Sequence, residues 1–205
     1  ADALAAYEPA APWSIIAITF TNKAANELKD RLTKMIGGTV GEDVWAMTFH
    51  SACCRILRRE IERLGYSSSF TIYDTTDSER VIKEILKEFN LDDKIFVPRK
   101  VLGAISKAKD KQQGAAEFRK DVGDDYRLRR IADIYEEYAK RLKASNAVDF
   151  DDIILLTVQL LQNFEDVRRY YQRKFRYVLI DEYQDTNHLQ YLLASLLAGG
   201  HENIC

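Results

Sequence analysis

The stretch Tyr177-Val178-Leu179-Ile180-Asp181-Glu182 decides how the fold of this chain is interpreted. A short apolar run of this kind predicts a buried strand, and two carboxylates follow it directly. In an open parallel sheet, ligands bind beyond the carboxyl ends of the strands. There Asp181 can hold Mg²⁺ while the ion bridges nucleotide phosphates, and Glu182 can orient and deprotonate an attacking water. The alternative is a strand that ends in a solvated acidic turn.

Three further runs predict strands, at residues 15–20, 44–49 and 70–73. Apolar residues at helical spacing separate them, with Thr21 as a cap and glycines 37 and 38 at the end of the first helix. The order strand, helix, strand, helix, strand predicts a parallel α/β sheet.

The middle of the chain has a different pattern, because residues 75–145 contain no comparable strand-like run. We expect helices at about 77–89, 98–109 and 127–143, joined by loops at 90–98 and 112–123. Helices at 151–161 and 165–174 follow, and another begins at Asn187 with Gln190 as a possible capping-box partner. The sequence therefore predicts an α/β domain in two parts, 1–74 and 146–205, interrupted by an all-helical insertion at 75–145.

The composition excludes several classes of protein. Of 205 residues, 46% are hydrophobic and 30% charged, which is typical of a folded domain, and the apolar runs are too short for a membrane helix. Three cysteines provide neither a disulfide framework nor zinc spacing, which favours a reducing, cytoplasmic location. Because the formal charge is −2, any nucleic-acid site must be a local patch.

The first two predicted strands both end in Thr-Phe, followed by polar residues and a helix. Phe20 and Phe49 can stack on bases of single-stranded DNA, since every base offers a face. The neighbouring side chains that can bond phosphates are Thr21, Asn22, His50 and Ser51. The alternatives are that both phenylalanines belong to the core and that His50 is a capping or core-bonded imidazole.

Two charged segments remain. Lys100, Lys107 and Lys111 fall on one helix face and can contact the DNA backbone, although a solvated helix face is the alternative. The segment 149–152 reads Asp-Phe-Asp-Asp, and its carboxylates can cap the helix that follows. We assign that segment no catalytic role.

Four strings together resemble motifs of the superfamily 1 DNA helicases of the UvrD/Rep/PcrA group. The string 181–187 (Asp-Glu-Tyr-Gln-Asp-Thr-Asn) resembles that family's second helicase motif, and 19–25 (Thr-Phe-Thr-Asn-Lys-Ala-Ala) resembles motif Ia. The string 48–51 resembles the next DNA-contacting motif, and 149–152 resembles the motif after the helical insertion. The resemblance covers nearly the whole chain.

The resemblance implies a RecA-like parallel sheet of the P-loop NTPase type. It implies ATP and Mg²⁺ as cofactors, with Asp181 on the metal, Asp181 and Gln184 at the cofactor, and Glu182 in catalysis. The implied partners are single-stranded and forked DNA and a second RecA-like domain of the same parent chain. The implied activity is ATP-driven 3′ to 5′ translocation and unwinding.

A phosphate-binding loop of the form G-x-x-x-x-G-K-[ST] is missing from the sequence. In the family that loop precedes motif Ia, so we expect this chain to be a fragment of a longer protein, without ATPase activity of its own. Two alternatives remain: a non-catalytic module that binds single-stranded DNA, and a subunit of a helicase-nuclease.

Overall fold

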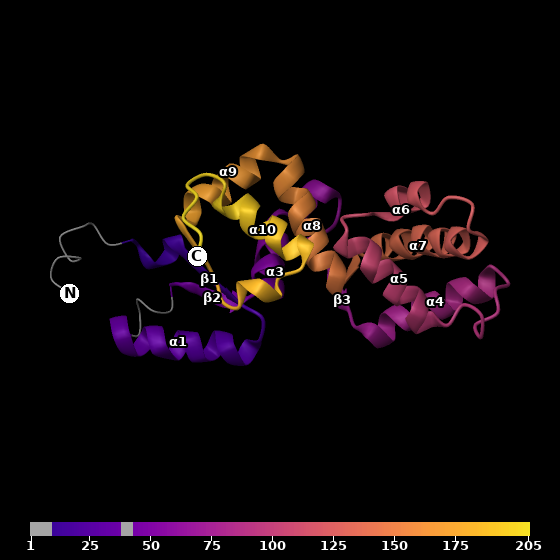
Figure 1. Ribbon diagram of the computed structural model, residues 1–205, viewed down its shortest axis with the longest axis horizontal. Helices are drawn as coiled ribbons and strands as arrows, with labels where there is room; N and C mark the ends of the chain where they lie inside the picture. Colours follow the sequence, from indigo (N-terminus) through magenta and orange to yellow (C-terminus); the bar gives the residue numbers. More distant parts are fainter. Residues whose placement is uncertain (1–9, 38–42) are drawn as a thin grey trace. The chain divides into compact units, whose positions relative to one another are not determined.

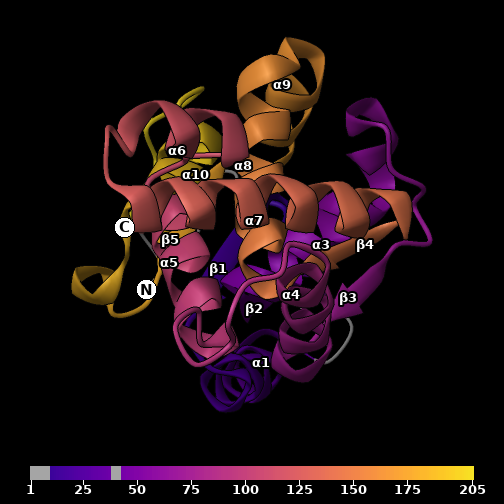
Figure 2. The same ribbon diagram turned by 90° about the vertical axis from the view of Figure 1, so that its right-hand side faces the viewer.

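The structure, a computed structural model, describes residues 10–37 and 43–205, and it divides into two compact units. Residues 1–56 and 158–205 belong to the first, which we call the sheet unit; residues 57–157 form the second, the helical unit. Figure 1 labels most of the helices and strands of both units, and Figure 2 also labels β4 (Ala147–Asp149) and β5 (Tyr177–Ile180).

The sheet unit is built on three parallel strands in the order β2-β1-β5. Residue 204 adds a parallel bridge to Val178 on the outer side of β5. The strands and helices with residues in this unit are β1 (Ile15–Thr19), α1 (Asn22–Ile36), β2 (Trp45–Thr48), α3 (Phe49–Glu60), α8 (Phe150–Asn163), α9 (Glu165–Lys174), β5 (Tyr177–Ile180) and α10 (His188–Ala198). The predicted parallel α/β architecture is confirmed for these strands.

Helices cover both faces of this sheet, with α1 on one side and α9 and α10 on the other (Figure 1). Leu28 and Leu32 of α1 pack against Ala17 and its neighbour Ala46. Successive strand residues point to opposite faces, so Trp45 faces the other way, where its ring lies 4.9 Å from that of Phe175 after α9. Burial on both faces explains why β1 is apolar at consecutive positions.

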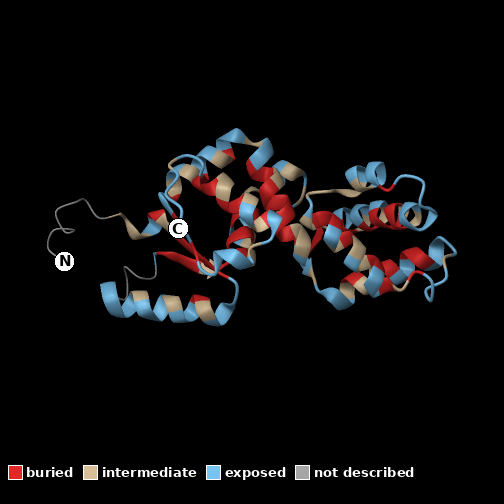
Figure 3. Cartoon of the chain, viewed as in Figure 1, coloured by how far each residue is buried: buried red, intermediate tan, exposed pale blue. Residues whose placement is uncertain are grey.

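The helical unit packs α4, α5 and α7 around one apolar core, and Figure 2 shows α7 lying across the view with α4 and α5 beside it. Figure 3 shows the buried residues along the facing sides of these helices. The other elements with residues in this unit, besides parts of α3 and α8, are β3 (Thr71–Tyr73), α4 (Thr75–Glu88), α5 (Pro98–Asp110), α6 (Ala115–Asp121), α7 (Tyr126–Ala144) and β4 (Ala147–Asp149).

The prediction that the strand at 70–73 belongs to the main sheet is wrong. The strand β3 pairs in parallel with β4, which the sequence did not predict, and the two form a separate small sheet. A strand of three residues, two of them exposed, has too little apolar surface for the middle of a buried sheet. The sequence also missed α6, which lies in the predicted loop. The assignment of 1–74, 75–145 and 146–205 to domains remains a prediction, since the compact units divide at other positions.

Several predicted helix ends are confirmed. Thr21 caps α1 by accepting a hydrogen bond from the amide of Ala24, and Gly37 follows its last turn. Asn187 and Gln190 form the reciprocal capping box at the start of α10. Gly38 lies outside the described residues. Within the ranges described, no helix is both long and apolar enough to cross a membrane.

Candidate nucleotide and nucleic-acid sites

The carboxyl ends of the three main strands meet at one edge of the sheet. Thr19 is in register with Thr48, and Ile18 with Ile180, so Asp181 stands level with Thr19. The amide of Asp181 donates to the carbonyl of Ile18 at 2.9 Å, which continues the pairing by one residue. The predicted acidic pair and both Thr-Phe strand ends therefore lie on the same edge.

The acidic turn exposes both candidate carboxylates to solvent. Glu182 adopts a left-handed conformation with φ of 51°, which is uncommon for a residue with a side chain and is held here by the turn around it. The amide of Asp185 donates to the Glu182 carbonyl at 2.9 Å, and the side-chain amide of Gln184 donates to the Glu182 carboxylate. Gln184 thus orients Glu182, while the side chain of Asp181 is exposed.

Asp181 fits one mode of magnesium binding. Over the described ranges, no three His, Cys, Asp or Glu side chains group closely enough to hold a metal ion by themselves. Mg²⁺ is often held by one or two carboxylates, with waters and substrate phosphates completing its shell. A single exposed carboxylate at a strand end suits that mode.

A cavity of about 830 Å³ adjoins this edge and is lined by Asp181, Thr19 and apolar residues of β1, α1 and β5. Leu179, which is 39% exposed, and Leu28 are among the apolar residues that line it. Such a lining suits packing against apolar groups rather than binding of a phosphate.

The two candidate stacking residues differ. Phe20 is 37% exposed, whereas Phe49 is 2% exposed and begins α3, so its prediction as a base-stacking residue is wrong. Phe49 belongs to the core, and its ring supports Phe20 at a centroid distance of 5.5 Å. Only Phe20 of this pair offers a ring to a base.

Among the polar residues near these rings, Thr21 and Ser51 form hydrogen bonds within their own segments. The Thr21 hydroxyl accepts the capping bond described above, and the Ser51 hydroxyl lies 2.9 Å from that of Thr48. Asn22 is exposed at the first turn of α1, and His50 is half-buried at the first turn of α3. The amides at these helix starts remain suited to phosphate.

In the helical unit, Lys100, Lys107 and Lys111 are exposed, as their common face predicts. Sequence reasoning missed Lys109, which lies on the same helix and is 2% exposed. Two residues along a helix are about 200° apart, so a lysine between Lys107 and Lys111 must point away from their face. That spacing was the available signal.

Sequence reasoning also missed Phe150, the first residue of α8, which is 57% exposed. Residues 153–158 of the same helix are all buried, so an exposed ring at its start departs from the pattern. Phe150 lines a pocket of about 240 Å³ together with Arg99, Gly103 and Ser106 of α5. Among the described residues that line it, the acidic ones are Asp74, Asp149 and Asp151, and the one basic residue is Arg99. An exposed ring beside an open glycine suits a base, and Arg99 is the group of this pocket that can pair with a phosphate.

A buried polar cluster lies beneath that pocket. The amino group of Lys109 is 2.6 Å from Asp149 Oδ2 and 2.7 Å from Asp152 Oδ1. Asp149 and Asp152 exchange backbone-to-side-chain hydrogen bonds, with the Asp152 amide 2.9 Å from Asp149 Oδ1 and the Asp149 amide 3.2 Å from Asp152 Oδ2. This reciprocal pairing confirms the predicted cap at the start of α8.

The three charges of the cluster shift one another's pKa values. Burial alone would lower the pKa of Lys109, but Asp152 and Asp149 outweigh it and raise that pKa. Burial opposes ionisation of Asp149 as well, yet the Lys109 charge and hydrogen bonds hold its pKa below the usual value. For Asp152, burial and the neighbouring Asp149 charge raise the pKa to about 6. The cluster is therefore close to gaining a proton near neutral pH.

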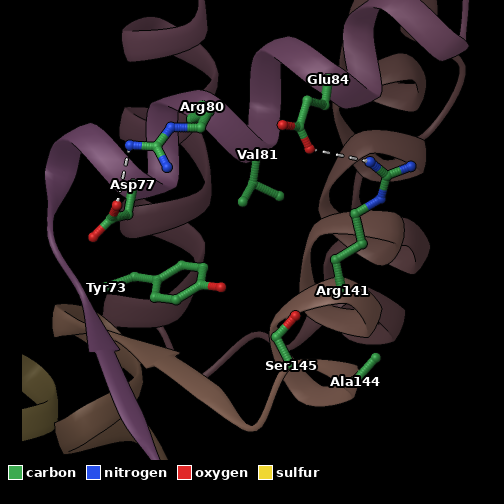
Figure 4. A pocket seen from close by; sticks show the side chains of 8 residues that line it. All are labelled: Tyr73, Asp77, Arg80, Val81, Glu84, Arg141, Ala144 and Ser145. Carbon is green, nitrogen blue, oxygen red and sulfur yellow. Dashed lines mark ion pairs between the residues drawn. The ribbon is translucent and has the colours of Figure 1, made fainter.

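A third pocket, of about 350 Å³, lies between α4 and α7 (Figure 4). Its charged groups pair with one another: Arg80 lies 3.4 Å from Asp77, and Arg141 lies 4.0 Å from Glu84. Because opposite charges balance inside it, we assign it no ligand.

Comparison with known proteins places these features in a family. Residues 3–205 match the sequence model of the UvrD/REP helicase N-terminal domain. The chain is 48% identical over 202 residues to the ATP-dependent DNA helicase PcrA of Bacillus subtilis strain 168, covering 98% of this chain and 27% of that protein. It is 46% identical over 194 residues to PcrA of Staphylococcus aureus strain Mu50, covering 95% and 26%. The chain thus spans about a quarter of the length of these curated relatives.

Proposed function

The chain belongs to the UvrD/REP helicase N-terminal domain family, and from this premise we propose that it is part of an ATP-dependent DNA helicase. The longer protein would move 3′ to 5′ along single-stranded DNA in the cytoplasm and unwind forked duplexes. The observation that carries the proposal is the shared sheet edge, where Asp181 and Glu182 stand level with the Thr-Phe end of β1. A second RecA-like domain of the same protein would close the nucleotide site.

At that edge the two carboxylates take separate roles. Asp181 holds Mg²⁺, which when bound neutralises charge on the nucleotide phosphates. Glu182 accepts a proton from the attacking water, because its carboxylate is exposed beyond the strand end. Gln184 keeps that carboxylate oriented through the hydrogen bond from its amide.

Single-stranded DNA is bound through aromatic rings and backbone contacts. In the sheet unit, Phe20 stacks on a base while Asn22, His50 and the helix-start amides contact phosphates. In the helical unit, Phe150 stacks on a base and Arg99 pairs with a phosphate. The remaining proposed contacts to phosphates of the single strand are Thr21 and Ser51. Three lysines of α5 are proposed to contact the backbone of the duplex ahead of the fork: Lys100, Lys107 and Lys111.

Glu182→Gln in the full-length protein tests the proposal. DNA-stimulated ATP hydrolysis should fall about 10²- to 10⁴-fold, which is the range for loss of a general base, while affinity for single-stranded DNA stays unchanged. The matched control is Glu165→Gln, an exposed glutamate of α9 that forms an ion pair with Arg169 one turn away. It should leave both properties unchanged.

Other outcomes separate the alternatives. Undiminished hydrolysis by Glu182→Gln, with intact DNA binding, would leave a non-catalytic module for single-stranded DNA. A metal-dependent DNA cleavage activity that Asp181→Asn abolishes would instead identify a helicase-nuclease subunit.

A further inference from the structure

Elements from across the helical unit meet at one buried amino group. Lys109, near the end of α5, bridges Asp149 at the end of β4 and Asp152 in the first turn of α8. The Tyr138 hydroxyl of α7 lies 2.9 Å from Asp149 Oδ2 and 3.0 Å from the Ser78 hydroxyl of α4. Tyr138 is fully buried, so this network holds the four helices and β4 in a single arrangement.

The same network flanks the pocket on both sides. Phe150 follows Asp149 directly and precedes Asp152 by two residues. Both of these carboxylates form ion pairs with Lys109 and hydrogen bonds with each other's backbone amides, so they fix the backbone that carries the Phe150 ring. On α5, the inward direction of Lys109 sets the rotation of the helix about its axis. That rotation decides where Arg99 and Gly103 stand opposite Phe150.

Packing alone does not explain a lysine at this position. Replacing buried ion pairs by apolar residues of similar volume is often neutral or stabilising in other proteins. What an apolar side chain cannot supply is a directed bond to two carboxylates, Asp149 and Asp152, on either side of the segment that carries Phe150. The charge of Lys109 therefore fixes the orientation of α5 and of the β4–α8 turn, which both line the pocket.

We propose that Lys109 is a positioning residue of the pocket in the helical unit, holding α5 and the β4–α8 turn so that Phe150 and Arg99 take one base and its phosphate. The inference rests on the proposed function, since it assumes that the pocket binds single-stranded DNA. Lys109 itself touches no DNA, because its amino group is buried among the two carboxylates.

A double-mutant cycle in the full-length protein tests this role. In the wild-type background, Phe150→Ala should weaken binding of a labelled oligo(dT) by about 5- to 100-fold, as expected for loss of one stacked base. The second background is Lys109→Met with Asp152→Asn, which removes one positive and one negative charge and so keeps the cluster's net charge. There, Phe150→Ala should change affinity less than about twofold, because the ring is already misplaced.

Two controls separate positioning from stability and from loss of charge. Lys83→Met removes an exposed lysine of α4 and should leave the effect of Phe150→Ala undiminished. Melting temperatures identify any background that does not fold. If the double variant does not fold, Asp152→Asn alone, which keeps the bond between Lys109 and Asp149, should reduce the effect of Phe150→Ala by an intermediate factor.

The outcomes are distinct. If Phe150→Ala weakens oligo(dT) binding by the same factor in both backgrounds, the two sites act independently and the positioning role is overturned. If Phe150→Ala leaves oligo(dT) affinity unchanged in the wild-type background, the pocket does not bind DNA and this inference fails. The proposed function is decided separately, by the rate of ATP hydrolysis of Glu182→Gln.

Discussion

Two parallel strands of this molecule run into carboxylates, and the two acidic pairs have opposite surroundings. After β5, Asp181 and Glu182 are exposed at the sheet edge, and the amide of Gln184 donates to Glu182. At the end of β4, Asp149 is buried and shares with Asp152 the amino group of Lys109. The first pair is available to a metal ion and a nucleotide, and the second is neutralised in part by the protein itself.

The comparison shows what decides whether an acidic strand end stays exposed to a ligand or is paired inside the protein. Both pairs satisfy the same local pattern of apolar residues followed by carboxylates. The deciding element is a lysine 40 residues before Asp149, which reaches it only through the packing of α5 against the rest of the helical unit. When a lysine of the same protein pairs with the carboxylates, they link secondary-structure elements together and are not available to a ligand.

Removing the counter-charge should produce a large change in stability. Lys109→Met leaves two carboxylates without their cation, and breaking a buried pair in this way costs about 3–5 kcal/mol of unfolding free energy. The control is Lys107→Met on the same helix, whose side chain is exposed and whose loss should cost less than about 0.5 kcal/mol. Urea denaturation measures both, and equal stabilities would contradict the structural role of the buried pair.

The buried carboxylate Asp152 should also make the stability of the protein depend on pH. Burial and Asp149 raise the pKa of Asp152 to about 6 from an ordinary value of 3.8, against the attraction of Lys109. Tyr66 and Tyr135 also lie within electrostatic reach of Asp152, and both are neutral in this range. The folded state then binds more protons than the unfolded state between those two pH values, so this group's stabilising contribution falls as pH rises from about 4 to 6.

The measurement is the difference in unfolding free energy between wild type and Asp152→Asn across that window. The wild type should lose stability relative to the variant as pH rises to about 6, by up to about 3 kcal/mol, and the difference should be flat above it. The matched control is Asp181→Asn, which removes an exposed carboxylate. A pH-independent difference for Asp152→Asn would mean that Asp152 ionises normally in the folded protein.

The two adjacent phenylalanines provide a third test. Phe20→Ala should weaken binding of single-stranded DNA by about 1–3 kcal/mol if a base stacks on its ring, with little change in stability. Phe49→Ala should instead cost about 3–5 kcal/mol of unfolding free energy, because its ring is buried. Oligonucleotide titrations and urea denaturation distinguish the two. A stability loss without a binding loss for Phe20→Ala would return Phe20 to the core.

The main strands and several caps were predictable because their signals are local. An apolar run bounded by polar residues located β1, β2 and β5, and the spacing of Asn187 and Gln190 located the start of α10. The contrast between Phe20 and Phe49 was not predictable, since both follow threonine at a strand end. It arises because α3 begins at Phe49 itself and turns the ring inward, whereas Phe20 precedes the cap of α1.

The sites of the helical unit were the least predictable, since they depend on distant pairings. The partner of Lys109 is 40 residues away, and β4 is recognisable as a strand only through its register with β3. Phe150 lies in the segment 149–152, whose carboxylates predict a helix cap, and the local sequence does not indicate that its ring is exposed. Long-range packing, rather than local pattern, decides these positions.

The smallest expected effect concerns the exposed lysines of α5. If Lys107 contacts a phosphate of the duplex at the fork, Lys107→Ala should weaken binding a few-fold and reduce the log–log salt slope by about 0.9. Lys100→Ala and Lys111→Ala should each do the same, because the three share one exposed face. Lys109→Met makes the comparison sharp, since it removes an equal charge from the opposite side of the helix. Lys109→Met should lower the salt slope only by the one phosphate contact that Arg99 loses when α5 shifts. If Lys107→Ala leaves the salt slope unchanged, the exposed lysine face is solvated and does not contact DNA.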